Sequence, residues 1–439
     1  MFDFMKSVHA PDKITDPKKV DSLYKYWRWR ILLSMYFGYA VFYFTRKSFT
    51  FAMPQMVKVL HLDKAEVGIL ATLFYIVYGL SKFLNGIISD KSNARYFMSI
   101  ALMMTGVANL FFGASNTLFW FSIFWIINAF FQGAGWPPCA KLLTHWYSKN
   151  ERGTWWGAWN TCHNVGGALI PLIAGAAATY LGWRYAMYIP GVIALIMGVL
   201  IWVGLRDTPE TMGLPPVEEY RNDYPDGHST QKANLSTKEI LFKYVLNNKY
   251  IWLLCFSYVM VYIIRTAIND WGALYLTENG YSVLSADSCL SFFEIGGFFG
   301  SIFAGVASDR IFAGRRGPVN IIYSVGIILA IACFWWLGPH FYFIAASCIF
   351  AIGFFVFGPQ MLIGVAAAEL SHREAAGTAT GFLGLFGYLG AALSGYPIGL
   401  ITQHYSWVGF FITIGVCGVL SIALLMPMWS VSSGNSSTN

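Results

Sequence analysis

The 439-residue chain is far more apolar than a water-soluble protein of its size. Hydrophobic residues make up 56% of it, aromatic residues 18% and charged residues only 12%. Soluble proteins carry about 25% charged residues, so most of this surface must face lipid. The composition excludes a soluble globular protein and predicts an all-α membrane protein, because helices satisfy their own backbone hydrogen bonds in a bilayer.

Twelve apolar stretches follow a polar, basic N-terminal segment that has no features of a cleaved signal peptide. Each is long enough to span a bilayer, which takes roughly 20 residues. They begin near Ile31, Val67, Tyr96, Leu118, Thr154, Trp183, Ile251, Ser285, Val319, Phe341, Thr378 and Trp407. The expected organisation is an N-terminal cytoplasmic segment (1–30), a six-helix bundle (31–205), a cytoplasmic linker (206–250), a second six-helix bundle (251–430) and a cytoplasmic tail (431–439).

The loops carry the charge that orients the chain. The interval 206–250 is turn-rich and poor in apolar residues, which is typical of a linker.

With the N-terminus inside, the inner loops are basic, whereas the outer loops hold Lys58, Lys64, Arg184 and almost nothing else basic. This asymmetry predicts that both termini lie on the cytoplasmic side of the membrane. It also accounts for the net charge of +7 without a nucleic-acid partner.

No cofactor, metal or catalytic motif stands out. The seven cysteines lie in apolar segments without metal or redox spacing, so they are expected to be packing residues. The chain has no Walker loop, no Gly-x-Ser-x-Gly and no HExxH motif. We therefore expect neither an enzyme nor a nucleotide-driven pump.

The two halves of the chain repeat each other. Gly86-Ile-Ile-Ser-Asp90 recurs 219 residues later as Gly305-Val-Ala-Ser-Asp309, and the same shift relates Arg46 to Arg265. Such duplications form pseudo-symmetric bundles that bind substrate between them, near the middle of the bilayer. Arg46 and Arg265 are therefore expected to face one cavity.

Ionisable residues well inside the spans are few, and each is a functional candidate because burial of charge in lipid is costly. They are Arg46, Lys47, Lys82, His163, Arg265, Asp270 and Glu294. The cations other than histidine outnumber the carboxylates by two, which suits a dianion such as a phosphate monoester. The planar guanidinium binds phosphate oxygens in pairs, so Arg46 and Arg265 are predicted to hold the phosphate. The alternative for either arginine is snorkelling to the interface or a permanent ion pair.

Polar aromatic residues accompany these cations at helical spacing. Tyr39, Tyr43 and Arg46 fall on one helix face, and Tyr262 lies one turn before Arg265. Their hydroxyls suit phosphate and sugar oxygens, although a single tyrosine is more often a packing or interface residue. His163 could change its protonation with the phosphate charge, or it could be a hydrogen-bonded structural histidine.

The repeated Gly-x-x-Ser-Asp loops are candidates for a cytoplasmic gate. An aspartate at a helix start caps the helix and can pair with a basic neighbour. The gate residues expected from this pattern are Asp90, Arg95, Asp309 and Arg310, with Arg315 and Arg316 downstream.

Several longer motifs resemble those of the organophosphate:phosphate antiporters of the major facilitator superfamily, over nearly the full chain. They are Gly38-Tyr-Ala-Val-Phe-Tyr-Phe-Thr-Arg46-Lys-Ser-Phe, Ser81-Lys82-Phe, Gly133-Ala-Gly-Trp136-Pro-Pro-Cys, Trp159-Asn160-Thr-Cys-His163-Asn164-Val-Gly-Gly, Arg265-Thr-Ala-Ile-Asn-Asp270-Trp and Phe357-Gly-Pro-Gln. The hexose-phosphate branch is the most similar.

The resemblance implies a major facilitator fold and a rocker-switch exchange of glucose 6-phosphate for inorganic phosphate. It implies that Arg46 and Arg265 hold the phosphoryl group, with Lys82 and His163 assisting. Lys47, Asp270 and Glu294 would exchange ion pairs during transport. The cavity would be lined by Tyr39, Tyr43, Trp136, Asn160, Tyr262 and Asn269.

Two other functions stay open. The hexose-phosphate branch also contains a transporter-like membrane sensor that detects external hexose phosphate and signals to a kinase partner. Trp136-Pro-Pro resembles the carriers, but Leu385-Phe-Gly-Tyr388 lacks the charged pair that hexose-phosphate carriers can have there. A proton-coupled sugar carrier is a third possibility, whose site should hold a lone carboxylate. One cavity per chain makes a monomer sufficient.

Overall fold

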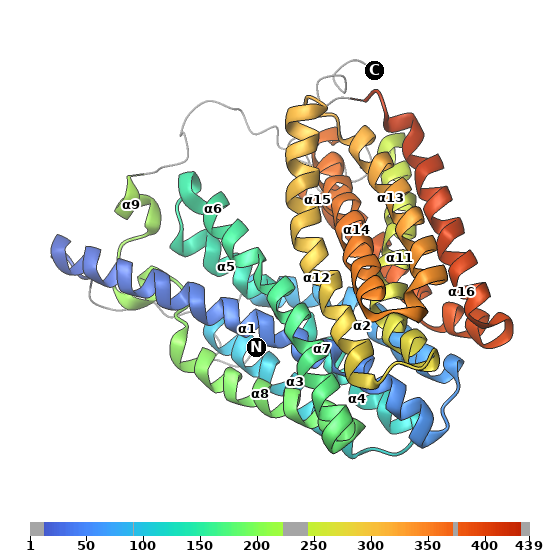
Figure 1. The fold of residues 1–439 in the computed structure, drawn as a ribbon. Coiled ribbons are helices and arrows are strands. Elements are labelled where there is room, and N and C mark those ends of the chain that lie inside the picture. Colours follow the sequence, from blue (N-terminus) through green and yellow to red (C-terminus); the bar gives the residue numbers. More distant parts are fainter. Residues whose placement is uncertain (1–12, 91, 223–244, 372–375, 432–439) are drawn as a thin grey trace. The chain divides into compact units, whose positions relative to one another are not determined.

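The structure is a computed structural model that describes residues 13–90, 92–222, 245–371 and 376–431 (Figure 1). The ends of the chain, much of the expected linker and the tail beyond residue 431 lie outside these ranges. Within them every regular element is helical. The long helices of the first half are α1 (Pro17–Leu60), α2 (Lys64–Asp90), α3 (Ala94–Ala114), α4 (Leu118–Gln132), α5 (Trp136–Trp146), α6 (Lys149–Asn160), α7 (Cys162–Leu181) and α8 (Trp183–Gly204). Those of the second half are α11 (Lys249–Glu278), α12 (Val283–Val306), α13 (Arg316–Leu337), α14 (Tyr342–Leu370), α15 (Ala376–Leu393) and α16 (Tyr396–Leu425).

Ten helical segments of the described chain are long and apolar enough to cross a membrane. α1 is not among them because Arg46, Lys47 and its tyrosines lower its mean hydropathy. The last of the ten, Ala379–Met428, contains a break at Ser406 and so holds two of the predicted helices. With α1 and this break counted, the predicted twelve helices are present and the all-helical membrane fold is confirmed.

Matching turns precede the last helix of each half. Gly182 has a φ of 99° directly before Trp183, and Ser406 has a φ of 56° directly before Trp407. Positive φ reverses the chain sharply and favours glycine, since a side chain crowds the backbone there. The helix starts predicted at Trp183 and Trp407 therefore coincide with real chain reversals.

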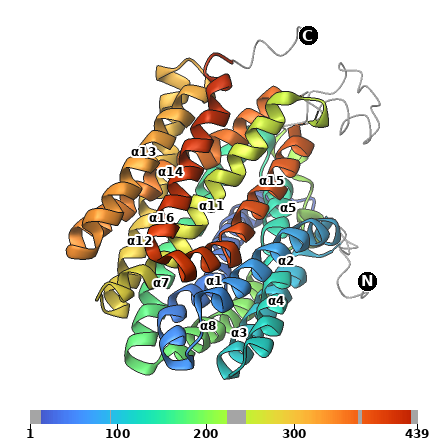
Figure 2. The same ribbon diagram turned by 90° about the vertical axis from the view of Figure 1, so that its right-hand side faces the viewer.

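The chain forms two compact units, each with its own packed core. The first is built from the described residues of Met1–Phe49, Val77–Ala177 and Leu181–Gln231, and the second from those of Thr50–Ile76, Ala178–Tyr180 and Lys232–Asn439. In the first unit α3 and α8 pack side by side, and in the second α12 packs along α14 (Figures 1 and 2). The C-terminal part of α1 and the N-terminal part of α2 thus pack with the second half of the chain. The hydropathy pattern does not predict this.

α1 begins at Pro17, well before the predicted start near Ile31, because its polar N-terminal part has a tertiary partner. Tyr24 stacks on Tyr220 with ring centroids 3.9 Å apart. The Tyr220 hydroxyl donates to Asp21 at 2.7 Å, and the Tyr24 hydroxyl donates to the carbonyl of Pro215 at 2.5 Å. The described start of the expected linker, including α9 (Val217–Arg221), is therefore packed against α1 rather than extended.

Glu151, in the first turn of α6, forms ion pairs with both α1 and α9. Its carboxylate pairs with Arg28 at 2.6 Å and with Arg221 at 2.9 Å. Burial raises the pKa of Glu151, but the hydrogen bonds from Arg221 and Arg28 outweigh burial and hold its pKa at about 2. The carboxylate is thus charged at any physiological pH and links α1, α6 and α9.

We expect Gly300→Ala to destabilise the second unit and Gly305→Ala, on the same helix, to be tolerated. A Cβ at Gly300 would collide with the Phe354 backbone of α14, whereas one at Gly305 would meet only Met361 Cε at 3.5 Å. Overpacking of this kind costs about 1–3 kcal/mol. Thermal unfolding of the purified variants in detergent measures the difference, and equal melting temperatures would contradict the close α12–α14 packing.

Candidate functional site

Arg46 is held by three side chains of the first unit. Its guanidinium carbon lies 4.5 Å from the centroid of the Tyr43 ring and 4.6 Å from that of Tyr78. Its Nε donates to the Oε1 of Gln132 at 3.2 Å. Cation–π contacts and a side-chain hydrogen bond together restrict the guanidinium to one orientation, as an anion-binding group requires.

A buried polar network sits behind Arg46 and fixes Gln132. The Gln132 Nε2 donates to the carbonyl of Phe42 at 3.0 Å and to the Thr45 hydroxyl at 2.8 Å. Asn128, one turn earlier on α4, donates to the carbonyl of Thr45 at 3.0 Å. Because both amide protons of Gln132 are used on α1, its carbonyl oxygen is directed to Arg46.

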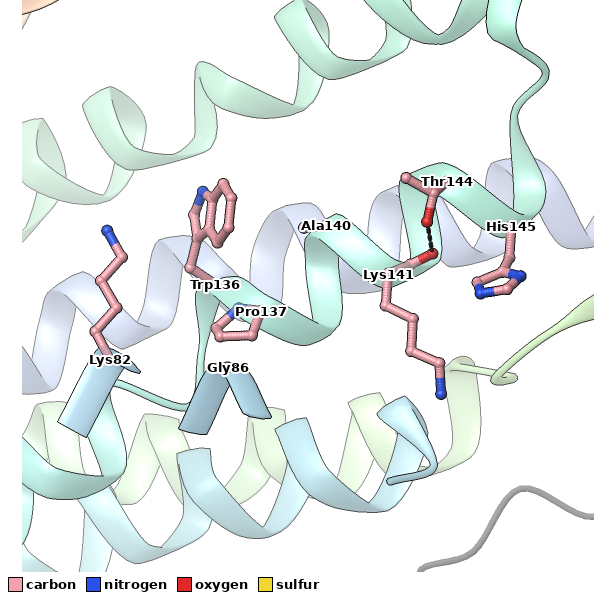
Figure 3. A pocket seen from close by; sticks show the side chains of 8 residues that line it. All are labelled: Lys82, Gly86, Trp136, Pro137, Ala140, Lys141, Thr144 and His145. Carbon is pink, nitrogen blue, oxygen red and sulfur yellow. Dashed lines mark hydrogen bonds between the residues drawn. The ribbon is translucent and has the colours of Figure 1, made fainter. Parts of the chain in front are cut away.

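Lys82 lies at a hollow in the first unit (Figure 3). The cavity has a volume of about 590 Å³ and is lined by Lys82, Gly86, Trp136, Pro137, Ala140, Lys141, Thr144 and His145. Lys82 Nζ lies 5.5 Å from the centroid of the Trp136 ring. Lys141 has a structural role, because its Nζ forms an ion pair with Asp207 at 3.0 Å and donates to the carbonyl of Ser92 at 2.7 Å. The structure thus joins Lys82 and Trp136, two of the predicted site residues, at one basic hollow.

The predicted aromatic residues and His163 gather beside Arg46. The Tyr43 ring lies 6.0 Å from the ring of Tyr39 on one side and 6.0 Å from that of His163 on the other. The Nδ1 of His163 is hydrogen-bonded to the backbone carbonyl of Asn160. A carbonyl only accepts, so Nδ1 carries a proton and the ring orientation is set by the backbone. The Asn160 side chain is exposed.

Arg265 has a similar environment in the second unit. Its guanidinium carbon lies 4.8 Å from the Phe357 ring and 5.6 Å from the ring of Tyr262, one turn earlier on α11. Tyr262 lies in turn beside Tyr258 and Tyr388, with ring centroids 4.6 Å and 6.4 Å away. In both units, therefore, an arginine within a spanning helix lies over the tyrosine one turn before it and over a ring from another helix.

The predicted ion-pair residues lie on three helices. Asp270 on α11 is buried and accepts hydrogen bonds from Tyr75 at 2.7 Å and Thr50 at 3.4 Å. Glu294 on α12 is buried, and Lys47 on α1 is half-buried. An exchange of ion pairs among these three residues stays a prediction.

Asn269, predicted to line the cavity, is buried next to Asp270. Its Oδ1 accepts no hydrogen bond from the residues that the structure describes. Buried amide oxygens normally have a donor, so this atom suits a hydroxyl group of a ligand.

The predicted gate residues have different partners. Asp309 pairs with Arg316, which also binds Glu369 at 2.8 Å, whereas Arg310 is exposed. In the first half, the Arg95 Nε donates to the carbonyl of Trp202 at 2.5 Å. The Asp90 side chain lies outside the part of the chain that the structure describes.

Gln132, Glu369 and Asp287 were missed by the sequence analysis. Gln132 is uncharged, so the presence of an ionisable group inside a span, the criterion for a candidate, does not identify it. Its signal is the pair Asn128 and Gln132, which lie on one face of an otherwise apolar helix. Asp287 lies one turn inside α12, close to the helix start predicted near Ser285, so its position in the sequence does not mark it as a group well inside the span.

A duplicated helical membrane protein with arginines inside its spans has the features of a secondary transporter for an anion. The family model of the Major Facilitator Superfamily matches residues 35–395. The chain belongs to this superfamily, in its organophosphate:phosphate antiporter branch, and the resemblance inferred from the motifs is confirmed.

Relatives of known sequence support this placement. The chain is 52% identical over 433 residues to the "Probable hexose phosphate transport protein" of Chlamydia trachomatis, covering 96% of this chain and 95% of that one. It is also 52% identical over 429 residues to the "Membrane sensor protein UhpC" of Escherichia coli, covering 97% and 98%. Identity to the "Glycerol-3-phosphate transporter" of Bacillus subtilis is 39% over 425 residues, covering 94% and 95%.

Solved structures agree in fold. A bacterial homologue of the human lysosomal transporter Spinster, in an inward-facing and occupied conformation, matches with a TM-score of 0.75 at 16% identity. The match covers 92% of this chain and 97% of that one. The nucleoside transporter NupG matches with a TM-score of 0.68 at 16% identity, covering 91% and 99%. At this identity the likeness concerns the fold alone, which is that of a multi-pass membrane transporter.

We expect Gln132→Leu to weaken phosphate binding by about tenfold, the equivalent of one lost side-chain hydrogen bond that orients a charged group. Gln132→Glu should weaken it further, because a carboxylate beside Arg46 competes with the anion. Binding of inorganic phosphate to the purified variants measures both, with thermal unfolding as the control for folding. Wild-type affinity in both variants would show that Gln132 does not position Arg46.

Proposed function

We propose that this chain is a secondary antiporter that exchanges glucose 6-phosphate for inorganic phosphate, and that it is not an enzyme. It acts in a bacterial inner membrane with both termini in the cytoplasm. The observation that carries the proposal is the pair of arginines at equivalent repeat positions, each oriented by aromatic rings inside its own unit. The names of the relatives, which include hexose phosphate and glycerol-3-phosphate transport, support the substrate class.

The roles follow from the chemistry of the side chains. Arg46 and Arg265 bind the phosphoryl oxygens through their planar forks. Lys82 and His163 add positive charge and hydrogen-bond donors for the same group. The sugar hydroxyls meet the polar and aromatic side chains of Tyr39, Tyr43, Trp136, Asn160, Tyr262 and Asn269.

We expect exchange, rather than uptake alone, because the ionisable residues well inside the spans are four cations and two carboxylates, a net excess of positive charge. A transporter whose spans carry surplus cations pays a desolvation penalty when they are sealed from water without an anion. A phosphate dianion neutralises the surplus, so the loaded transporter changes conformation more readily than the empty one. Alternating access by a rocker switch, with Lys47, Asp270 and Glu294 exchanging ion pairs, then couples one phosphate out to one sugar phosphate in. One binding site per chain makes a monomer sufficient.

A sensor of external hexose phosphate is the second candidate. It is favoured by the 52% identity to a membrane sensor protein and by the uncharged segment Leu385–Tyr388. A sensor would bind the same ligand through the same arginines but would pass the signal to a kinase partner. Binding without transport separates it from the antiporter.

The deciding experiment is uptake of radiolabelled phosphate into liposomes that hold the purified protein, with and without trapped phosphate. The proposal predicts uptake that requires trapped phosphate and is inhibited more strongly by glucose 6-phosphate than by glycerol 3-phosphate or glucose. Binding of glucose 6-phosphate without any uptake would favour the sensor. Inhibition by free glucose alone would contradict a phosphate site.

We expect Arg46→Lys and Arg265→Lys each to reduce exchange by about 10–100-fold, because a lysine point charge replaces a paired, charge-assisted contact worth about 1.5–3 kcal/mol. Arg221→Lys is the matched control, since Arg221 forms a half-exposed ion pair with Glu151 away from the spans. Initial rates of phosphate exchange, corrected for the amount of reconstituted protein, give the comparison. Near-normal rates for either spanning arginine variant would remove that residue from the site.

A further inference from the structure

Asp287 is a buried carboxyl group that the proposed transport mechanism does not use. It lies one turn inside α12, its exposed fraction is 0%, and neither of its oxygens has a hydrogen-bond partner in the described part of the chain. Ser291, one turn further along the same helix face, is also buried, and its hydroxyl has no partner there either. Two adjacent buried polar groups without partners are rare in proteins and call for an explanation.

The helices around Asp287 do not supply a countercharge. α12 packs against α11 and α14, and the Ser288 hydroxyl next to Asp287 pairs with the Tyr342 hydroxyl of α14 at 2.9 Å. Titratable side chains on these three helices include Cys289 and Glu294 on α12, Asp270, Tyr275 and Glu278 on α11, and Tyr342 and Cys348 on α14.

Three of these groups bind residues other than Asp287. Asp270 is bound by Tyr75 and Thr50, Tyr275 donates to the carbonyl of Trp335 at 3.2 Å, and Glu278 pairs with Lys64 at 2.8 Å. No basic side chain on α11, α12 or α14 hydrogen-bonds to Asp287.

An ionised carboxylate in such a place would carry the full cost of desolvation without compensation, which is many kcal/mol. A metal ion could compensate it, but the described residues contain no group of three or more His, Cys, Asp or Glu side chains that could hold one. A proton needs no cavity and no further ligand. We propose that Asp287 is a proton-binding site and that it carries its proton in the conformation described here.

The proton links conformation to pH. Any conformation that exposes this end of α12 to water lets Asp287 ionise, so the proton-bound conformation is favoured at low pH and disfavoured as the pH rises. For transport, which rests on the proposed function, this means that a proton is bound and released on α12 during the cycle, away from the arginines that hold phosphate. Ser291, at i+4 on the same helix face, is not hydrogen-bonded to Asp287 in this conformation, so the proposal does not depend on it.

Infrared difference spectroscopy of the reconstituted protein tests the site without any transport. The carbonyl stretch of a protonated carboxyl group, recognised by its shift in heavy water, should be present at neutral pH in the wild type. A component of it should be lost in Asp287→Asn and retained in the control Glu219→Gln, which changes an exposed acid on α9. Asp287→Glu, which keeps the acid, should retain a shifted band and serves if the asparagine variant folds poorly. An unchanged band in Asp287→Asn would overturn the proposal.

Phosphate self-exchange as a function of pH gives the second readout. Asp287→Asn resembles the protonated acid, so it should lose the part of the pH dependence that the wild type and Glu219→Gln share. A pH profile identical to the wild type, in a variant that still exchanges phosphate, would contradict a proton released during the cycle. Absence of exchange at every pH in all three proteins would count against the antiporter function while the infrared result still decided the proton site.

Discussion

The positive charge carried by half-buried arginines inside the spanning helices is the constraint on which the proposed function depends. Arg46 lies within α1 under the rings of Tyr43 and Tyr78, and Arg265 lies in α11 beside Tyr262 and Phe357. Aromatic faces at both arginines, and the Gln132 amide oxygen at Arg46, lower the cost of placing these charges inside the spanning helices.

The two units stabilise polar and charged side chains inside their spanning helices through different hydrogen bonds. In the first unit Gln132 donates to the Phe42 carbonyl and the Thr45 hydroxyl of α1 and accepts from Arg46, so that contacts to α1 fix the group that orients the arginine. In the second unit Asp270 accepts hydrogen bonds from the hydroxyls of Tyr75 and Thr50. These bonds join the C-terminal part of α1 and the N-terminal part of α2 to α11. Asp287 has no such hydrogen bonds in the described part of the chain, and the proton that we propose for it would remove the charge that burial disfavours.

The twelve helices, the duplication and the family were predictable from the sequence, because lipid imposes a hydrophobic length and the halves share motifs. The early start of α1 at Pro17 was not, since it depends on the stacking of Tyr24 on Tyr220, two residues almost two hundred positions apart. The loop pattern named Arg310, Arg315 and Arg316 as basic residues near Asp309 but did not choose among them. Arg310 is its neighbour in sequence, but the turn before α13 brings Arg316 to it instead. Asp287 could not be separated from a helix end until its burial was known.

The most direct test of the central claim is the binding of inorganic phosphate to purified wild type, Arg46→Lys and Arg265→Lys by calorimetry, independent of any transport. If both arginines hold one phosphoryl group, the wild type binds one phosphate per chain and each variant loses at least about tenfold in affinity, or roughly 1.4 kcal/mol. Wild-type affinity in either variant, or two phosphates bound per chain, would contradict the account.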